Sequence, residues 1–361
     1  MFPYILLILI PFYFETIERI LKPFPKNPFT TRNSNKSIII FFIIFFFVLA
    51  LRSTSCGNDV KGYEYYFKMT ENLDFIDLFN DQAIEPLYLV LNWVVLHIYP
   101  DYRIFLAIVA FLSCFFTGWF YAKKSEDAFL TIILFATNTC FTIVFSGLRQ
   151  GLAMQFIIPA YYLTMQKKII PFLLTVFVAY YIHSSALIIL LLYPVFHLPI
   201  KNKHFPIIIF VVLFFFILKK QIFSVVFPFL IGRYSKYSVL RETGSFAVYL
   251  FFLICLIISF IYPDEKKISS EIRGLRNVMA LMTVIQCFSA IHTLAMRMNY
   301  YFIMLFPIII PKILNIPKKG NENFVKTTKC VFVLFLTFFF FYTVCSNMGV
   351  KTIFPYRAYW E

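Results

Sequence analysis

The chain has 361 residues, of which 60% are hydrophobic and only 14% are charged. A soluble domain carries roughly 25% charged residues, and 49 Phe and 23 Tyr are too many for one water-facing core. The net charge of +15 does not indicate nucleic-acid binding, because the Lys and Arg stand between apolar runs rather than on one soluble face. The composition therefore excludes an ordinary soluble domain and indicates an integral membrane protein.

Apolar runs begin at the first residue and recur to the end of the chain. They lie at 1–14, 37–51, 84–99, 104–122, 128–147, 150–165, 169–198, 205–218, 246–262, 277–294, 298–315 and 330–346. About 18–20 apolar residues suffice to cross a bilayer, and a crossing segment must satisfy its own backbone hydrogen bonds. We therefore predict an all-α, polytopic membrane protein in which residues 1–361 form one transmembrane domain. The first run lacks the features of a cleaved signal peptide and is expected to be a span.

The connections between the runs divide by charge. Six basic connections hold 20 of the 33 Lys and Arg, at 15–36, 122–127, 165–168, 199–204, 263–276 and 312–329. Because Lys and Arg accumulate in cytoplasmic loops, we place these connections in the cytoplasm. The other connections then lie outside, at 52–83, 149–150, 219–245, 297 and 347–361.

Two stretches do not fit a simple alternation of crossings. The 84–99 run cannot cross, because the connections on either side of 84–122 need opposite faces; Pro86 and Pro100 at its borders favour a re-entrant or surface helix. The 169–198 stretch is too long for one span and is interrupted at His183, so we predict two short helices that meet at the outer face. The result is roughly eleven crossings, with the N-terminus outside.

Several ionisable residues reach the outer face in this topology. They are Arg52, Arg149, His183, Arg233, Arg297 and Arg357. An Arg at a helix end can simply extend to the headgroups, but Arg149 and Arg297 have almost no polar loop around them. The planar guanidinium binds phosphate oxygens in pairs and remains charged at working pH. Converging Arg residues therefore predict a site for an anionic lipid headgroup or a diphosphate, whose charge they stabilise without a metal.

His183 is the histidine that this topology places at the outer face, beside small polar residues. Imidazole accepts a proton near neutral pH, so His183 is a candidate general base for a hydroxyl acceptor such as a sugar. The alternative is a structural residue at a helix break. The other histidines are expected at interfaces or in the core: His97, His197, His204 and His292. No metal-ligand spacing, Walker motif or GxGxxG occurs, so we expect no metal and no nucleotide.

Six short motifs are spread along residues 37–361, each occurring once. They are Arg52 with Gly57-Asn58-Asp59, Tyr63, Tyr65 and Tyr66; Glu85-Pro86; Gly147-Leu148-Arg149-Gln150-Gly151; His183-Ser184-Ser185-Ala186; Arg297 with Tyr300 and Tyr301; and Pro355-Tyr356. Each is short, but the ordered set resembles the EpsG-type, Wzy-like polysaccharide polymerases of bacterial surface glycan assembly. Asn58 departs from that pattern, and the 219–245 segment matches no part of it.

The resemblance implies a GT-C-like glycosyltransferase of the bacterial inner membrane that uses no cofactor. Such enzymes move a glycan chain from undecaprenyl diphosphate to the non-reducing end of a lipid-linked repeat unit, at the periplasmic or outer face. The candidate catalytic residues are His183, Arg149 and Asp59, of which Asp59 would orient His183 or bind the acceptor. The candidate substrate-binding residues are Arg52, Gln150, Arg233, Arg297, Tyr300, Tyr356 and Arg357.

The expected partners are the lipid-linked oligosaccharide, the bilayer and a chain-length regulator, for which the sequence holds no motif; nucleic acid is not expected. Other membrane transferases, namely an O-antigen ligase or an O-acyltransferase, remain alternatives, as do a lipid-linked glycan flippase and a lipid-binding scaffold. A flippase would need charges along a central cavity and repeated halves, neither of which the sequence shows. An acyltransferase would need His183 to meet a cytoplasmic acyl donor. A polymerase is therefore favoured.

Overall fold

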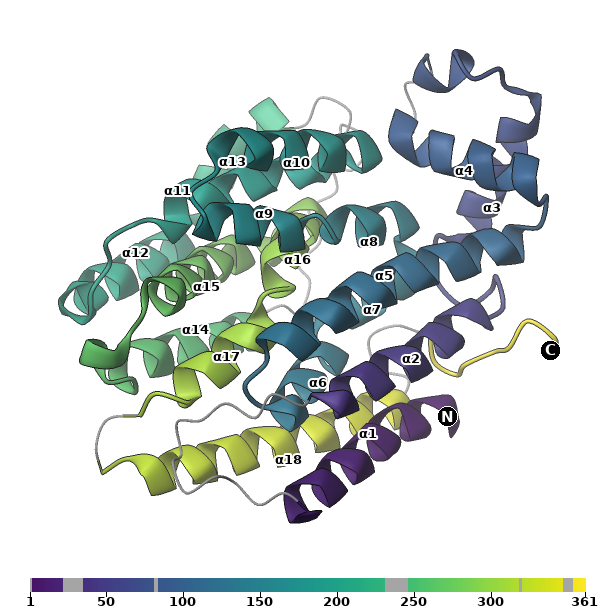
Figure 1. Cartoon of the computed structure of the whole chain (residues 1–361). Coiled ribbons are helices and arrows are strands. Elements are labelled where there is room, and N and C mark those ends of the chain that lie inside the picture. The colour runs from purple at the N-terminus through teal and green to yellow at the C-terminus, as the bar shows by residue number, and fades with distance from the viewer. Residues whose placement is uncertain (1, 22–34, 81–83, 231–245, 318–319, 347–352) are drawn as a thin grey trace.

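The computed structural model is helical throughout (Figure 1). It describes residues 2–21, 35–80, 84–230, 246–317, 320–346 and 353–361. Within these residues no strand forms, and the backbone makes only two isolated antiparallel bridges, Arg52 with Ala358 and Pro263 with Pro317. The prediction of an all-α protein is confirmed for this part of the chain.

The first third of the chain builds a packed helical group and a projecting lobe. Helix α2 (Lys36–Ala50) packs against both α1 (Phe2–Leu21) and α5 (Tyr102–Lys124). Between α2 and α5 the chain forms α3 (Val60–Met69) and α4 (Pro86–Ile98), which project at the same end of the molecule as the two termini (Figure 1). We call this the outer end and the opposite one the inner end.

The remaining helices complete the bundle. They are α6 (Ala128–Ala136), α7 (Thr139–Ser146), α8 (Leu148–Met154), α9 (Ile157–Met165), α10 (Ile169–Ile182), α11 (Leu192–Phe196), α12 (Phe205–Ile217), α13 (Lys219–Leu230), α14 (Phe246–Ile261), α15 (Ser270–Ser289), α16 (Thr293–Ile303), α17 (Phe306–Leu314) and α18 (Glu322–Ser346). A 3-10 segment, Ser184–Leu191, joins α10 to α11. Shorter 3-10 turns lie at Thr70–Asn72, Asp77–Phe79, Asn202–His204 and Glu265–Lys267.

Several apolar runs that read as single spans are broken in the structure. Helices α6 and α7 meet at 53°, where the Asn138 side chain accepts hydrogen bonds from the amides of Cys140 and Phe141 and so starts a new helix. Helices α16 and α17 meet at 50°, just before Pro307, which lies in the first turn of α17 and cannot donate a backbone hydrogen bond.

Length and composition decide which helices could cross a membrane unaided. Among the described residues two helices pass, Tyr102–Lys124 and Asn323–Ser346, or up to five spans if each bent pair is one. The other apolar helices have 10–17 residues and reach about 15–26 Å, short of a hydrocarbon core about 30 Å thick. The structure thus agrees with a membrane protein, while the eleven crossings and the GT-C-like fold stay predictions.

Helix α4 bears on the predicted topology. Its 13 residues reach about 20 Å, which is too short to cross the bilayer. Glu85 precedes Pro86 and is extended, as expected of a residue before proline, so the helix can begin only at Pro86. This length agrees with the re-entrant or surface helix predicted for 84–99.

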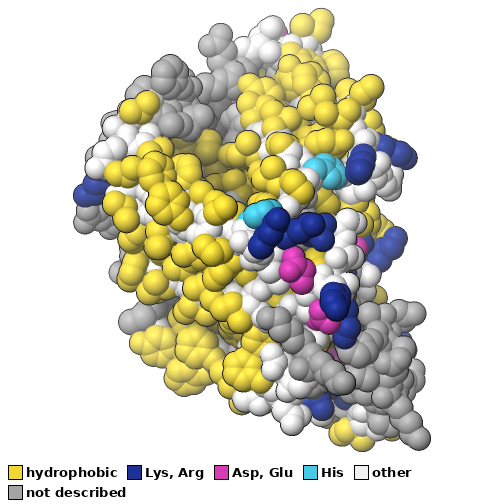
Figure 2. Space-filling model, turned by 90° about the vertical axis from the view of Figure 1, so that its left-hand side faces the viewer, with side chains coloured by type: hydrophobic (Ala, Val, Ile, Leu, Met, Phe, Trp, Pro, Cys, Tyr) yellow, Lys and Arg dark blue, Asp and Glu magenta, His cyan; other side chains and the backbone are white. Residues whose placement is uncertain are grey.

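The basic connections meet at the inner end. Asn35 donates to the Ala122 carbonyl at 2.9 Å, Lys124 Nζ lies 3.2 Å from Glu271 Oε1, and Lys312 Nζ lies 3.4 Å from Glu126 Oε1. Figure 2 shows the side of the molecule that lies at the left of Figure 1, where charged side chains gather within a largely hydrophobic surface. The connections 15–36, 122–127, 263–276 and 312–329 are therefore neighbours. That this side is cytoplasmic rests on the charge rule and stays a prediction.

Candidate functional site

Three breaks in helical structure meet near the outer end of the molecule. Glu85 occupies the position just before α4, and His183 ends α10 in an extended conformation before the 3-10 segment. Arg149 lies in the short helix α8, one residue after the bend at Gly147 and Leu148. Because each residue stands at an interruption, its side chain is free of the regular packing of a long helix and can reach the other two.

Glu85 holds the group together. Its Oε2 accepts a hydrogen bond from Arg149 Nη1 at 2.6 Å, and its Oε1 accepts one from the Ser184 amide at 2.9 Å. His183 Nδ1 lies 3.4 Å from Glu85 Oε1, which is long for a hydrogen bond but close enough to tighten when substrate is bound. Glu85 and His183 are each 6% exposed, so these contacts are shielded from water.

The electrostatics of the group set the charge states of Glu85 and His183. Burial disfavours the charged form of Glu85, but the nearby imidazole of His183, the charge of Arg149 and the Ser184 amide together hold its pKa well below the usual range. Burial lowers the pKa of His183 from its usual value, and Glu85 only partly offsets this. At neutral pH the group therefore holds a carboxylate beside a neutral imidazole.

A neutral imidazole beside a carboxylate has a preferred proton position. The proton belongs on Nδ1, the ring nitrogen nearest the Glu85 carboxylate, and the lone pair is left on Nε2. Within the described part of the chain Nε2 has no hydrogen-bond partner. A histidine in this position can accept a proton at Nε2, and the Glu85 carboxylate can stabilise an imidazolium.

Cations outnumber carboxylates in this cluster. The Arg149 guanidinium lies 5.7 Å from the centre of the Tyr63 ring and shares Glu85 with His183. Gln150 Nε2 donates to the Arg297 carbonyl at 2.6 Å, which fixes α8 against α16. The Arg297 charge acts on both His183 and Tyr63, yet no ion pair forms at Arg297 among the described residues. We call Glu85, Arg149, His183 and Arg297 the outer cluster; its excess positive charge suits an anion.

The other candidate catalytic residue, Asp59, lies at the start of α3, one turn before Tyr63. Its charge acts on Tyr63, but among the described residues no contact joins its carboxylate to His183. In the structure the carboxylate beside His183 belongs to Glu85. The role of Asp59 toward the acceptor stays a prediction.

A second group of the candidate residues lies under the C-terminal segment. Arg52 is 2% exposed, donates from Nη1 to the Leu49 carbonyl at 3.1 Å and lies near Tyr356. The Ser53 amide donates to the Arg357 carbonyl at 2.8 Å, so the C-terminal segment is held against the chain after α2. The structure brings Arg52, Tyr356 and Arg357 together, but no contact joins them to His183 in the described residues.

The remaining candidates divide between the core and the uncertain segments. Tyr300 is buried, and its carbonyl accepts a hydrogen bond from Cys140 Sγ at 3.4 Å. Its neighbour Tyr301 lies 3.0 Å from Ser185 Oγ, which joins the two motifs in which these residues stand. Arg233 lies outside the described residues. Where the chain is described, no group of three or more His, Cys, Asp or Glu is placed so that it could hold a metal ion.

No functional role for Glu85 is predicted from the sequence, in which it marks the start of the run 84–99 and forms part of the Glu85-Pro86 motif. The signal was present, because Glu85 stands at the start of the apolar run 84–99, where a carboxylate is costly and marks a functional site by default. Residue spacing could not show which groups contact Glu85, because Arg149 and Ser184 are 64 and 99 residues away in the sequence.

The sequence matches one family description, the EpsG family, over residues 35–358. The match covers most of the chain and includes every residue of the outer cluster. No curated protein and no solved structure matches the chain.

Proposed function

Because the chain belongs to the EpsG family of Wzy-like polysaccharide polymerases, we propose that it transfers a glycan chain from undecaprenyl diphosphate to the non-reducing end of a lipid-linked repeat unit. The proposed site is the outer cluster, facing the periplasm or outside of a bacterial inner membrane. The observation that supports it is the position of Glu85, which contacts a candidate base and a candidate anion-binding residue at once.

The proposed reaction uses the two residues that Glu85 contacts, His183 and Arg149. An acceptor hydroxyl beside His183 Nε2 gives up its proton to the imidazole as its oxygen attacks the anomeric carbon of the donor. The bond from that carbon to the diphosphate oxygen breaks, and undecaprenyl diphosphate leaves as an anion. Arg149 and Arg297 stabilise the charge that develops on the leaving oxygens, which requires no metal.

The stereochemical outcome also follows. The described cluster holds one carboxylate, and Arg149 and the Ser184 amide already occupy its two oxygens. Glu85 is therefore suited to orienting His183 rather than to attacking a sugar. A single displacement with His183 as base inverts the anomeric carbon.

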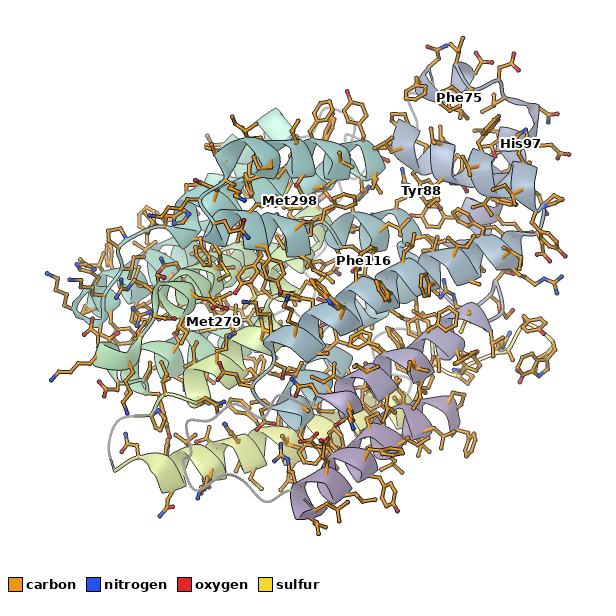
Figure 3. All side chains as sticks on the ribbon, viewed as in Figure 1. Phe75, Tyr88, His97, Phe116, Met279 and Met298 are labelled. Atoms are coloured by element: carbon orange, nitrogen blue, oxygen red, sulfur yellow. The ribbon has the colours of Figure 1, made fainter. Side chains whose placement is uncertain are left out.

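The test is polymer formation by purified protein from lipid-linked repeat units. His183→Ala should remain folded and bind the repeat unit but lose about 10²–10⁴-fold in rate, which is the usual contribution of a general base. The matched control is His97→Ala, because His97 is exposed and lies at the far end of α4 (Figure 3). Polymer of normal length and rate from folded His183→Ala would refute the assignment.

A further inference from the structure

An apolar groove lies between α4, α5 and the segment from α8 to the start of α9, and Ile182 at the end of α10 also lines it. Its volume is 420 Å³, within the range of about 300–1,000 Å³ that is typical of small-molecule sites. Helix α4 contributes Leu91 and Tyr88, and α5 contributes Leu112 and Phe116. Tyr88 and Phe116 come from these two neighbouring helices (Figure 3). We call this space the α4–α5 groove.

Three residues that line the groove are near neighbours in sequence of Glu85, Arg149 and His183. Tyr88 lies one turn after Glu85, Leu152 one turn after Arg149, and Ile182 directly before His183. The Tyr88 ring also packs 5.6 Å from the ring of Tyr63, which in turn lies beneath Arg149. The groove and the outer cluster are therefore adjacent parts of one site.

The groove opens toward lipid. Leu112 and Phe116 lie 10 and 14 residues into α5, a helix long enough to cross the membrane, and so about 15–21 Å below its outer end. Phe116 remains 42% exposed, and Val94 on the facing helix 38%. At that depth the surroundings are hydrocarbon, so the groove gives lateral access from the bilayer.

Its lining offers little to a sugar. The one amide among the lining residues, Gln155, is already bonded to Thr117 at 2.9 Å and to the Gly151 carbonyl at 3.1 Å. Apart from the Tyr88 hydroxyl, the other lining side chains are hydrocarbon. A site with surplus cations next to a hydrocarbon-lined groove complements a molecule with an anionic head and an apolar chain.

We propose that the α4–α5 groove holds the isoprenoid chain of the lipid-linked substrate while its diphosphate reaches Arg149 and Arg297. This inference rests on the proposed function. Moving the chain from lipid into an equally apolar groove gains little hydrophobic free energy. The groove therefore acts by orienting the diphosphate, and its effect belongs in kcat/KM rather than in membrane binding.

The first test is photo-crosslinking of wild-type protein in phospholipid vesicles. The probe is undecaprenyl diphosphate with a diazirine on its isoprenoid chain near the head, and a phospholipid with the same group is the comparison. We expect the isoprenoid probe to label the peptides of α4, α5 and the α8–α9 segment that line the groove, well above the phospholipid. Equal labelling by both probes, or labelling spread over the exposed faces of α18, would overturn the inference, whether or not the protein polymerises.

The second test fills the groove. Leu112→Trp should lower kcat/KM about tenfold for a repeat unit on undecaprenyl diphosphate, yet leave a repeat unit on a two-isoprene diphosphate within about twofold. The control is Phe115→Trp, because Phe115 is 53% exposed on the same helix and does not line the groove. An equal loss on both substrates, or no loss on either, contradicts the inference. If wild-type protein makes polymer from neither substrate, the proposed function is refuted. The crosslinking result would then still show whether the groove binds the isoprenoid chain.

Discussion

The two ends of the molecule use charged residues in different ways. At the inner end, ion pairs of 2.9–3.8 Å join side chains from six parts of the chain. We call this set the inner network; it holds four carboxylates and four cations, Glu15, Glu126, Asp127 and Glu271 with Arg19, Lys124, Lys312 and Lys329. At the outer end, Glu85 is the one carboxylate that contacts Arg149 and His183 among the described residues, and the charge of Arg297 also acts on His183.

We infer from this difference in charge balance that the inner network is structural and that the outer cluster binds a ligand. The inner network joins α1, α5, α15, α17 and α18, and each cation in it meets a carboxylate, so it needs no ligand to be satisfied. The outer cluster retains a positive charge that the described protein does not neutralise. Since an uncompensated charge in a low-dielectric site is costly, its presence is explained if an anion binds there during function.

The largest expected effect concerns which compartment each end faces. In a variant without the native Cys, Asn58→Cys at the outer end should react with a membrane-impermeant maleimide added to spheroplasts, because Asn58 is exposed there. Lys203→Cys, exposed in a basic connection, should react only after the membrane is opened. The reverse pattern would place the outer cluster in the cytoplasm and remove the proposed mechanism.

Glu85→Gln should cause the next largest effect. It removes the charge that orients His183 and pairs with Arg149, and we expect a loss of about 10³-fold in polymer formation. The matched control at the inner end is Glu126→Gln, which removes a carboxylate from the balanced network and should leave the rate per folded molecule unchanged. Similar losses from both changes would mean that the two ends do not differ in function.

The pH profile separates positioning from a general loss of structure. His183 must be neutral to accept a proton, so activity falls as the pH drops through the pKa of His183, which burial places below its usual value. Glu85 raises that pKa, so Glu85→Gln should move the acidic limb of residual activity to lower pH. An unchanged limb would show that Glu85 does not act through His183.

Much of this arrangement could be predicted from the sequence. Apolar runs predicted most helices, and the polar break at His183 and the proline borders of 84–99 predicted both irregular segments. The bend at Asn138 was hidden, because one capping side chain inside an apolar run does not change its hydropathy. Arg149 and His183 could be chosen because charge in an apolar setting is rare. That Glu85 joins them depends on tertiary contacts, which residue spacing does not encode.

Arg149→Lys tests whether the surplus cation binds phosphate. The change keeps the charge but removes the planar fork, so we expect about a 10²-fold loss with protein levels intact. Arg103→Lys is the control, because Arg103 is exposed and pairs with Asp101 two residues away. That variant should keep nearly full activity. If both substitutions are tolerated equally, Arg149 merely compensates Glu85.

The smallest effect on activity is expected at the inner end. Lys124 Nζ lies 3.2 Å from Glu271 Oε1 with 16% of its side chain exposed, whereas the adjacent Lys123 is exposed and lies over the Trp119 ring. Lys124→Gln leaves Glu271 with Tyr161 and Lys312, so the carboxylate loses one of its partners rather than all. We expect a cost of about 1–3 kcal/mol, less than for a fully buried pair that loses its only partner. Thermal unfolding in detergent should show a lower midpoint for Lys124→Gln than for Lys123→Gln, while the polymer rate per folded molecule stays the same in both. A change in polymer length or rate at unchanged stability would show that the inner network communicates with the outer cluster, and the two ends could no longer be treated as independent.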